Sequence, residues 1–264
     1  MMAFTSYYAS YMENLQETED ERVANWYLMD SPSTVFSISF AYIVICKYLG
    51  PRLMKDRKPF SLKRTILIYN MIQILLCAWF SFTIIKDNTW VITKLICDPE
   101  EFNPYKIIDV CYWALYLKML ELVETVFFIL RKKQSQVTNL HLYHHATTFL
   151  FVWLGVKYKG GLGVSTCILL NSLVHIIMYT YYSIAASGNP KTRKFLQKYK
   201  KYITIIQMVQ FTIMLAIIAR YYIAGCIRSW AIALLFVPNV IFVFYMFYQF
   251  YHSMETVKRK DSGK

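Results

Sequence analysis

Three histidines lie close together in one apolar segment of the chain. They are His141, His144 and His145 in the run Leu-His-Leu-Tyr-His-His, and the chain has only five histidines in all. Spacings of three and four residues place side chains on one face of a helix, within reach of a common reactant. Imidazole can act as a nucleophile, a metal ligand or a proton carrier near neutral pH. The pattern therefore predicts a reactive site or a metal site.

The histidine segment is one of several long apolar runs in a chain that is 56% hydrophobic. About 20 residues of helix cross a hydrocarbon core of about 30 Å. Backbone polar groups in lipid must be satisfied within the segment itself, which favours helices over strands or loops. We therefore expect seven transmembrane helices, at roughly 33–50, 65–85, 107–130, 137–157, 162–187, 202–224 and 229–252.

The basic residues are concentrated in alternate loops. Of 29 Lys and Arg residues, seven lie in 47–64, three in 131–133, six in 188–201 and four after residue 252. Cytoplasmic loops carry an excess of Lys and Arg, so the N-terminus is expected outside the cytoplasm and the C-terminus inside it. We expect an acidic lumenal tail at 1–32, a membrane domain at 33–252 and a basic cytoplasmic tail at 253–264. This distribution argues against nucleic acid as the partner.

Further polar residues occur at matching depths in four of the expected helices. Residues at three-residue spacing share a face of a helix, and ionisable groups within a bilayer are rare and usually functional. The positions place these groups in the cytoplasmic half, around a shared chamber that opens to the cytoplasm. Outside the histidine box, they are Lys118, Glu121 and Glu124; Asn171 and His175; and Thr204, Gln207 and Gln210.

Structural explanations of the same residues remain open. Lys118 with Glu121 or Glu124 could be an ion pair that fixes helix register, and the two glutamines could join helices by hydrogen bonds. A zinc site of three or four histidines is an alternative to nucleophilic chemistry. Adjacent helical residues such as His144 and His145 point about 100° apart, which disfavours joint ligation. We expect no metal.

Two of the six cysteines fall outside the expected spans. Cys97 and Cys226 lie in loops that the topology places on the same, non-cytoplasmic side. Disulfides persist in oxidising compartments such as the lumen of the endoplasmic reticulum. We predict that these two cysteines form a disulfide.

The polar residues belong to motifs that resemble those of the very-long-chain fatty acid elongases. The resemblance covers residues 26–255, and the order of the motifs makes it specific. Its motifs here are Leu49-Gly50-Pro51, Arg57-Lys58-Pro59-Phe60, Lys118-x-x-Glu121-x-x-Glu124-Thr125, Leu130-Arg131-Lys132-Lys133, Gln136-Val137-Thr138, His141-x-x-His144-His145, Asn171-x-x-x-His175-x-x-Met178-Tyr179-x-Tyr181-Tyr182 and Thr204-x-x-Gln207-x-x-Gln210.

The resemblance implies an all-α membrane enzyme with seven transmembrane helices, six of them forming a barrel around a narrow acyl tunnel. It implies a 3-oxoacyl-CoA synthase of the endoplasmic reticulum membrane, which condenses a long-chain acyl-CoA with malonyl-CoA and releases CO2 and CoA. No cofactor is expected beyond these two substrates. The other enzymes of the elongation cycle, the reductases and the dehydratase, are the implied partners, and a homo-oligomer is compatible with this interpretation.

The resemblance also implies roles for individual residues. His144 and His175 correspond to the histidines linked to the acyl intermediate, with His141, His145 and Glu124 supporting the chemistry. The family pattern has Asp where this chain has Glu124, which leaves the role of that carboxylate open. We expect substrate contacts from Lys118, Glu121, Asn171, Tyr182, Gln207 and Gln210.

Two other classes of membrane protein share the expected orientation. A seven-helix receptor would leave the histidines and the carboxylate stripe unexplained. A proton-coupled transporter could use buried Glu and His as a relay, so flux without CoA-dependent chemistry would favour it.

Overall fold

The computed structural model describes residues 2–94, 104–158, 161–227 and 229–262. Within them every regular element is helical, as the apolar runs predict. The elements are α1 (Met2–Thr18), η1 (Glu21–Val23), α2 (Pro32–Val44), η2 (Ile45–Leu49), α3 (Gly50–Leu53), α4 (Lys63–Lys94), α5 (Pro104–Leu130), η3 (Gln134–Gln136), α6 (Asn139–Lys157), α7 (Gly161–Ser187), α8 (Pro190–Gln197), α9 (Lys200–Ile223) and α10 (Trp230–Ser262).

Each of the seven expected membrane segments is occupied by a helix. Five helical stretches within the described part of the chain are long and apolar enough to cross a membrane: Pro32–Leu53, Lys63–Lys86, Gly163–Ser187, Lys200–Ile223 and Trp230–Thr256. The protein is therefore a polytopic membrane protein. α5 and α6, which carry the polar motifs, are not among the five because ionisable side chains interrupt their apolar sequences.

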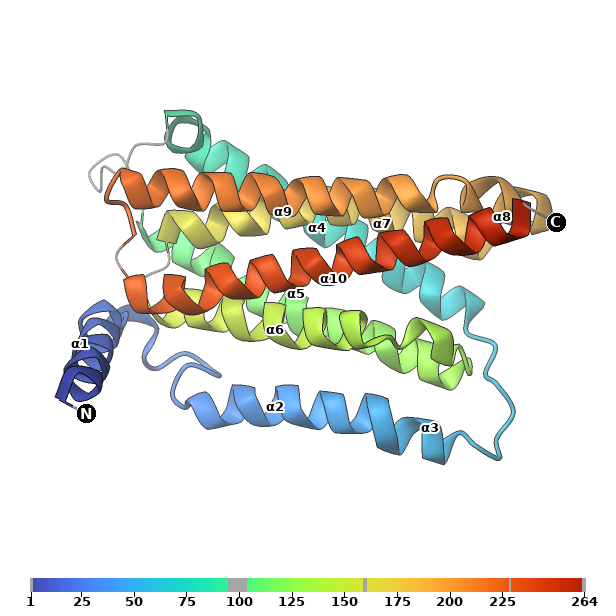
Figure 1. Ribbon diagram of the computed structural model, residues 1–264, viewed down its shortest axis with the longest axis horizontal. Coiled ribbons are helices and arrows are strands. Elements are labelled where there is room, and N and C mark those ends of the chain that lie inside the picture. Colours follow the sequence, from blue (N-terminus) through green and yellow to red (C-terminus); the bar gives the residue numbers. More distant parts are fainter. Residues whose placement is uncertain (1, 95–103, 159–160, 228, 263–264) are drawn as a thin grey trace.

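The long helices run side by side as a bundle (Figure 1). Six of them contact their neighbours in the closed order α4, α5, α6, α10, α9, α7 and back to α4. Contacts of α7 with α5 and α6 cross this arrangement. α2 lies outside it and packs against α6, while η2 and α3 reach α5. The polar motifs of α5, α6 and α7 therefore face one another inside the bundle.

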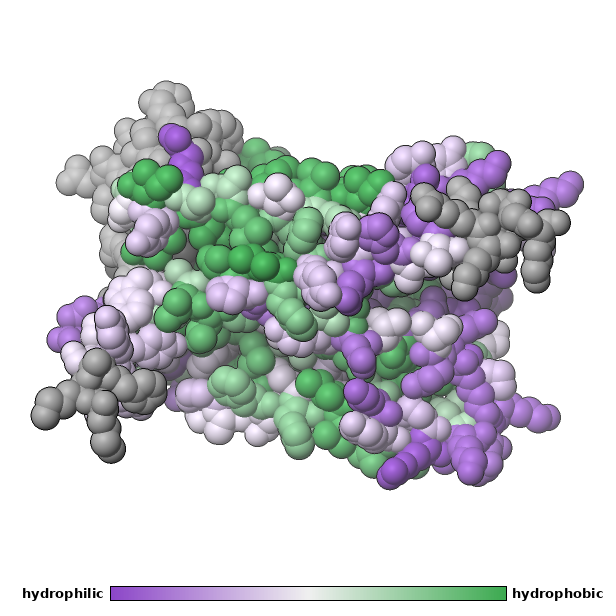
Figure 2. Space-filling model, in the orientation of Figure 1, coloured by the Kyte–Doolittle hydropathy of each residue, from purple (hydrophilic) through white to green (hydrophobic). Residues whose placement is uncertain are grey.

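The two ends of the bundle differ in character. The connection before α4, the segment between α5 and α6, helix α8 and the C-terminus all lie at the same end, opposite the N-terminus (Figure 1). These are the basic segments, and Figure 2 shows hydrophilic residues gathered at that end beside a hydrophobic band. Large apolar side chains of the membrane-length helices are exposed, including Phe40 (70%), Phe82 (65%) and Leu234 (59%). Such exposure is typical of a lipid-facing surface.

The N-terminal residues have more structure than an acidic tail. Helix α1 packs against the start of α10, where the backbone N–H of Ala231 donates to Asn14 Oδ1 (3.1 Å). The following segment covers the end of α6: Trp153 Nε1 donates to the Leu28 carbonyl (2.7 Å) and Lys157 Nζ to the Met29 carbonyl (3.0 Å). These residues contain no apolar stretch, and their attachments are made to helices that are distant in the sequence, so local patterning did not predict them.

The predicted disulfide lies partly outside the described residues. Cys226 is disulfide-bonded, but Cys97 is not among the residues that the structure describes. The pairing of these two residues stays a prediction. Cys46, Cys77, Cys111 and Cys167 are free thiols.

Candidate active site

The histidine box occupies the first turns of α6. Thr138 is the N-cap of this helix, and its hydroxyl oxygen accepts from the backbone N–H of His141 (3.1 Å). A threonine N-cap satisfies an N–H group that the helix itself leaves unpaired. The cap fixes where the helix begins and directs the box residues toward α5, α9 and α10.

Helix α5 contributes a lysine and two carboxylates, all nearly inaccessible. Lys118 is 4% exposed, Glu121 1% and Glu124 7%. Lys118 Nζ donates to both Glu121 oxygens (2.8 and 3.0 Å) and to Asn171 Oδ1 on α7. Buried charges are stable only when paired and hydrogen-bonded. The three-residue stripe predicted from the sequence is therefore present, and its lysine is neutralised by Glu121.

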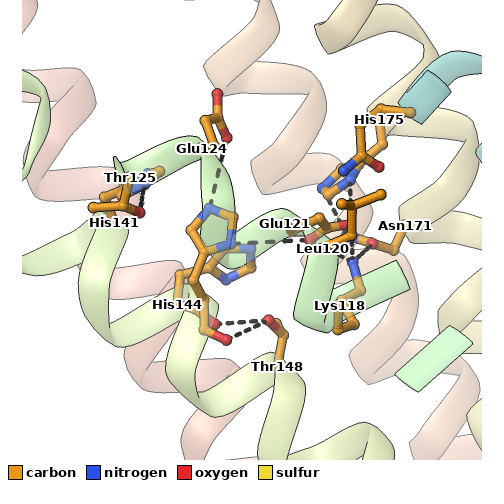
Figure 3. Close-up of polar contacts among 12 residues, drawn as sticks. Lys118, Leu120, Glu121, Glu124, Thr125, His141, His144, Thr148, Asn171 and His175 are labelled. Atoms are coloured by element: carbon orange, nitrogen blue, oxygen red, sulfur yellow. Dashed lines mark hydrogen bonds and ion pairs between the residues drawn. The ribbon is translucent and has the colours of Figure 1, made fainter. Parts of the chain in front are cut away.

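Glu121 is the centre of the network (Figure 3). Its Oε1 lies 3.2 Å from His175 Nδ1 on α7, and its Oε2 lies 3.9 Å from His145 Nδ1 on α6. The other nitrogen of His175 lies 3.2 Å from Asn171 Nδ2. His145 Nε2 lies 3.9 Å from Glu124 Oε2. One carboxylate thus lies beside two histidines from different helices, an arrangement suited to acid–base chemistry.

His144 occupies a different environment from its neighbour His145. Its ring packs edge-on against Phe211 of α9 and Phe247 of α10, with ring centroids 6.2 and 5.8 Å apart. Its Nδ1 is buried without a hydrogen-bond partner among the described residues. The imidazole of His144 therefore packs against two aromatic rings, while His145 faces the carboxylates. This division follows from the angle of about 100° between adjacent helical side chains.

His141 completes the box through a hydroxyl group. Its Nε2 lies 2.8 Å from Thr125 Oγ1 on α5. Its ring packs between His145 (centroids 4.3 Å apart) and Phe128 (5.3 Å). Thr125, the last residue of the Lys-x-x-Glu-x-x-Glu-Thr motif, is completely buried. The structure therefore brings His141 to Thr125 rather than to Glu121, which lies one turn earlier on the same helix, α5.

The remaining predicted substrate-contact residues lie around this network. Gln207 Nε2 donates to Met178 Sδ (3.6 Å), which joins α9 to α7, and Gln210 Nε2 donates to Met214 Sδ (3.5 Å). Tyr182 packs against the rings of Tyr179 and Tyr181. None of the three makes a hydrogen bond to a site histidine among the described residues. Their substrate contacts stay predictions.

One group of residues has the side chains of a metal site. An oxygen of Glu124 and one nitrogen each of His141 and His145 lie within 4.8 Å of one another. Ligands on one tetrahedral zinc ion are about 3.4 Å apart, whereas His145 Nε2 and Glu124 Oε2 are 3.9 Å apart. Thr125 already contacts His141 Nε2. A metal would therefore require these side chains to move closer, and chelation is the direct test of this alternative.

The sequence analysis missed one residue of this region. Tyr42 of α2 is buried, and its hydroxyl lies 2.7 Å from Thr125 Oγ1. It is one of 22 tyrosines in the chain and lies in an apolar run outside the motifs. Only the packing of α2 against the bundle could have identified it.

The fold and the site together define a polytopic helical membrane protein with a buried His–Glu–Lys network at the meeting of three helices. Residues 27–263 match the model of the family described as ELO: GNS1/SUR4. The chain belongs to this family, and the match confirms the resemblance found in its motifs.

Curated relatives carry the name very long chain fatty acid elongase. One from Aedes aegypti is 38% identical over 218 residues, covering 80% of this chain and 60% of the relative. Elongase 7 of Drosophila melanogaster is 37% identical over 216 residues, covering 80% and 65%. Elongase 4 of Homo sapiens is 35% identical over 250 residues, covering 93% and 79%. The chain thus spans less than two thirds of the length of the two insect proteins.

Proposed function

We propose that the protein is a 3-oxoacyl-CoA synthase that condenses a long-chain or very-long-chain acyl-CoA with malonyl-CoA. The products are 3-oxoacyl-CoA, CO2 and CoA. The observation that carries this proposal is a histidine packed against aromatic rings, His144, in the same buried site as two histidines that lie beside the Glu121 carboxylate, His145 and His175. Membership of the elongase family and the names of the relatives agree with it.

We further propose that α5 and α6 cross the membrane with the other five helices. Six helices then surround a narrow acyl tunnel, and α2 lies outside it. The closed order of contacts among the six supports this arrangement. The charged residues of α5 are tolerable in lipid because they face the bundle interior and are paired there.

In the first step we assign His144 as the nucleophile. Its ring nitrogen attacks the thioester carbonyl carbon, the C–S bond breaks, and CoA leaves with the imidazole proton. The product is an acyl-imidazole, which is itself a reactive acyl donor. The aromatic rings of Phe211 and Phe247 favour the neutral, nucleophilic form of His144 because they provide no counter-charge.

In the second step malonyl-CoA loses CO2, and its C2 carbon attacks the acyl carbonyl. The bond to His144 breaks, and the imidazole recovers a proton. We assign His175, oriented by Glu121 and Asn171, to proton transfer, and Lys118 to stabilising the charge of Glu121. Negative charge on the enolate oxygen requires a hydrogen-bond donor. Asn171 or a histidine is the proposed source.

The extra methylene of Glu124 relative to the family's Asp is compatible with this scheme. Glu124 Oε2 lies 3.9 Å from His145 Nε2, and the residue is only 7% exposed. We propose that it supports His145, and that His141 supplies a hydrogen bond at the same side of the site.

Substitution of His144 tests the assignment directly. Purified protein incubated with acyl-CoA alone should gain the mass of an acyl group, and His144→Ala should abolish both this adduct and malonyl incorporation. His252→Ala is the matched control, because His252 is exposed and, within the described part of the chain, its ring packs against the tyrosine rings of Tyr248 and Tyr251. A full adduct on His144→Ala would remove His144 from the mechanism, and solute flux without CoA-dependent chemistry would favour a transporter.

The cellular setting is also a proposal. We place the protein in the endoplasmic reticulum membrane, with the N-terminus lumenal and the basic end of the bundle cytoplasmic. The gathering of basic segments at one end supports this orientation. The other enzymes of the elongation cycle would receive the product, because a 3-oxo group must be reduced, dehydrated and reduced again before another cycle.

A further inference from the structure

A tyrosine hydroxyl from outside the six-helix arrangement reaches the active-site region. Tyr42 of α2 is 7% exposed and belongs to an apolar cluster with Leu122, Leu142 and Ala146. A buried hydroxyl in such surroundings is costly unless it is hydrogen-bonded. Its one hydrogen-bond partner among the described residues is Thr125 Oγ1, at 2.7 Å.

Tyr42, Thr125 and His141 form a continuous chain of hydrogen bonds. Thr125 Oγ1 lies 2.7 Å from the Tyr42 hydroxyl and 2.8 Å from His141 Nε2. Both distances are those of strong hydrogen bonds. The chain therefore joins three helices, α2, α5 and α6, and ends on a member of the histidine box.

Of the possible proton arrangements along these two hydrogen bonds, one gives an acceptor to each hydroxyl proton. If His141 donates to Thr125 and Thr125 donates to Tyr42, the phenol proton has no acceptor. If His141 and Tyr42 both donate to Thr125, the threonine proton has none, since no hydrogen bond from Thr125 to a carbonyl occurs among the described residues; Thr147 and Thr148 of α6 do make such bonds. Each of these arrangements leaves a buried donor unpaired, at a cost of about 1–3 kcal/mol.

Only the third arrangement satisfies both hydroxyl protons. In it, Tyr42 donates to Thr125, Thr125 donates to Nε2 of His141, and the imidazole proton lies on Nδ1, which is not among the buried, unpaired side-chain nitrogens of the described residues. Tautomers of histidine are inferred from such networks rather than observed.

We propose that Tyr42 is a positioning residue that acts through Thr125 to hold His141 as its Nδ1–H tautomer. Since Nε2 faces Thr125, Nδ1 is the nitrogen left for the substrate or for the nearby carboxylate of Glu124. His141 is thereby a hydrogen-bond donor in the site and not a base. This consequence for catalysis rests on the proposed condensing activity, whereas the tautomer itself does not.

Nitrogen NMR of histidine-labelled protein tests the tautomer without reference to activity. The full chain has only five histidines, so ring nitrogens labelled with ¹⁵N give a spectrum that can be assigned by single substitutions. The wild type should show a protonated Nδ1 and a hydrogen-bonded, unprotonated Nε2 for His141. A proton on Nε2 of His141 in the wild type would overturn the proposal.

Four variants separate the effect of these hydrogen bonds on the His141 tautomer from a general loss of stability. Tyr42→Phe removes one hydroxyl, and the His141 signals should shift toward a mixture of tautomers. Tyr48→Phe is the matched control, because this tyrosine follows on the same helical run and is 50% exposed. Thr125→Val should have the same effect as Tyr42→Phe, and Thr125→Ser should preserve the wild-type spectrum. Identical His141 spectra for Tyr42→Phe and the wild type would refute the role of Tyr42.

Kinetics then test the catalytic consequence. Tyr42→Phe should lower kcat about five- to tenfold with little change in KM, the loss expected for one mispositioned hydrogen bond. Tyr48→Phe should match the wild type. An altered tautomer with unchanged kcat would refute the role of His141 as a donor. If the wild type does not condense acyl-CoA with malonyl-CoA, the proposed function fails while the tautomer assignment stands.

Discussion

Replacing Glu121 by glutamine removes the charge at the centre of the network while keeping the size of the side chain. The side chains of Lys118 and Glu121 are only 5% and 1% exposed, so water cannot screen the ammonium that is left behind. Lys118 Nζ would lose the carboxylate that it contacts at 2.8 and 3.0 Å. Its remaining acceptor outside residue 121, Asn171 Oδ1, carries no charge. We expect Glu121→Gln to reduce the free energy of unfolding by about 3–5 kcal/mol, the cost of an unpaired buried charge.

Thermal unfolding of the purified protein measures this effect. For a chain of this size, 1 kcal/mol corresponds to about 2–4 °C, so the midpoint should fall by roughly 10 °C. Glu255→Gln is the matched control: Glu255 also pairs with a lysine, Lys201, but at 3.7 Å and with both side chains 31% exposed. An exposed pair contributes at most about 1 kcal/mol.

A second variant distinguishes charge burial from lost packing. Combining Glu121→Gln with Lys118→Met removes both charges, and most of the lost stability should return. Condensing activity should stay absent in the double variant, because His175 no longer lies beside the Glu121 carboxylate and His145 keeps only that of Glu124. If Glu121→Gln costs no more than Glu255→Gln, the network is not a buried ion pair and the reasoning is wrong.

Three further predictions follow from individual contacts. A Cβ added at Gly155 of α6 would collide with Val164 Cγ2 of α7, so Gly155→Ala should lower the free energy of unfolding by about 1–3 kcal/mol. Gly163→Ala, where the nearest neighbouring atom, Tyr221 Cδ2, lies 4.0 Å away, should not lower it, and equal unfolding midpoints for the two variants would contradict this. Lys157→Met removes the bond to the Met29 carbonyl (3.0 Å) and the ion pair with Glu19 (2.6 Å), so limited proteolysis should cut the N-terminal segment faster than in the wild type. Exhaustive chelation should leave condensing activity unchanged, and a loss restored by a divalent metal would instead support a metal at Glu124, His141 and His145.

The sequence by itself determined the helical class, the seven helical segments and the polar stripe and histidine box within two of them. Lipid leaves the backbone little choice but helix, and helical periodicity then fixes which residues of one segment share a face. The stripe at Lys118, Glu121 and Glu124 and the histidine box could therefore be predicted from local spacing. The gathering of basic segments at one end also follows from local composition.

Only the tertiary structure decided which of these residues meet. That His144 faces Phe211 and Phe247 while His145 faces Glu121 and Glu124 depends on where α5, α9 and α10 surround α6. The contact of Tyr42 with Thr125 joins residues 83 positions apart, and no local pattern marks it. The attachment of residues 19–30 to the end of α6 is of the same kind. The physical reason is that periodicity fixes directions within one helix, whereas partners are fixed by the packing of helices that are distant in the sequence.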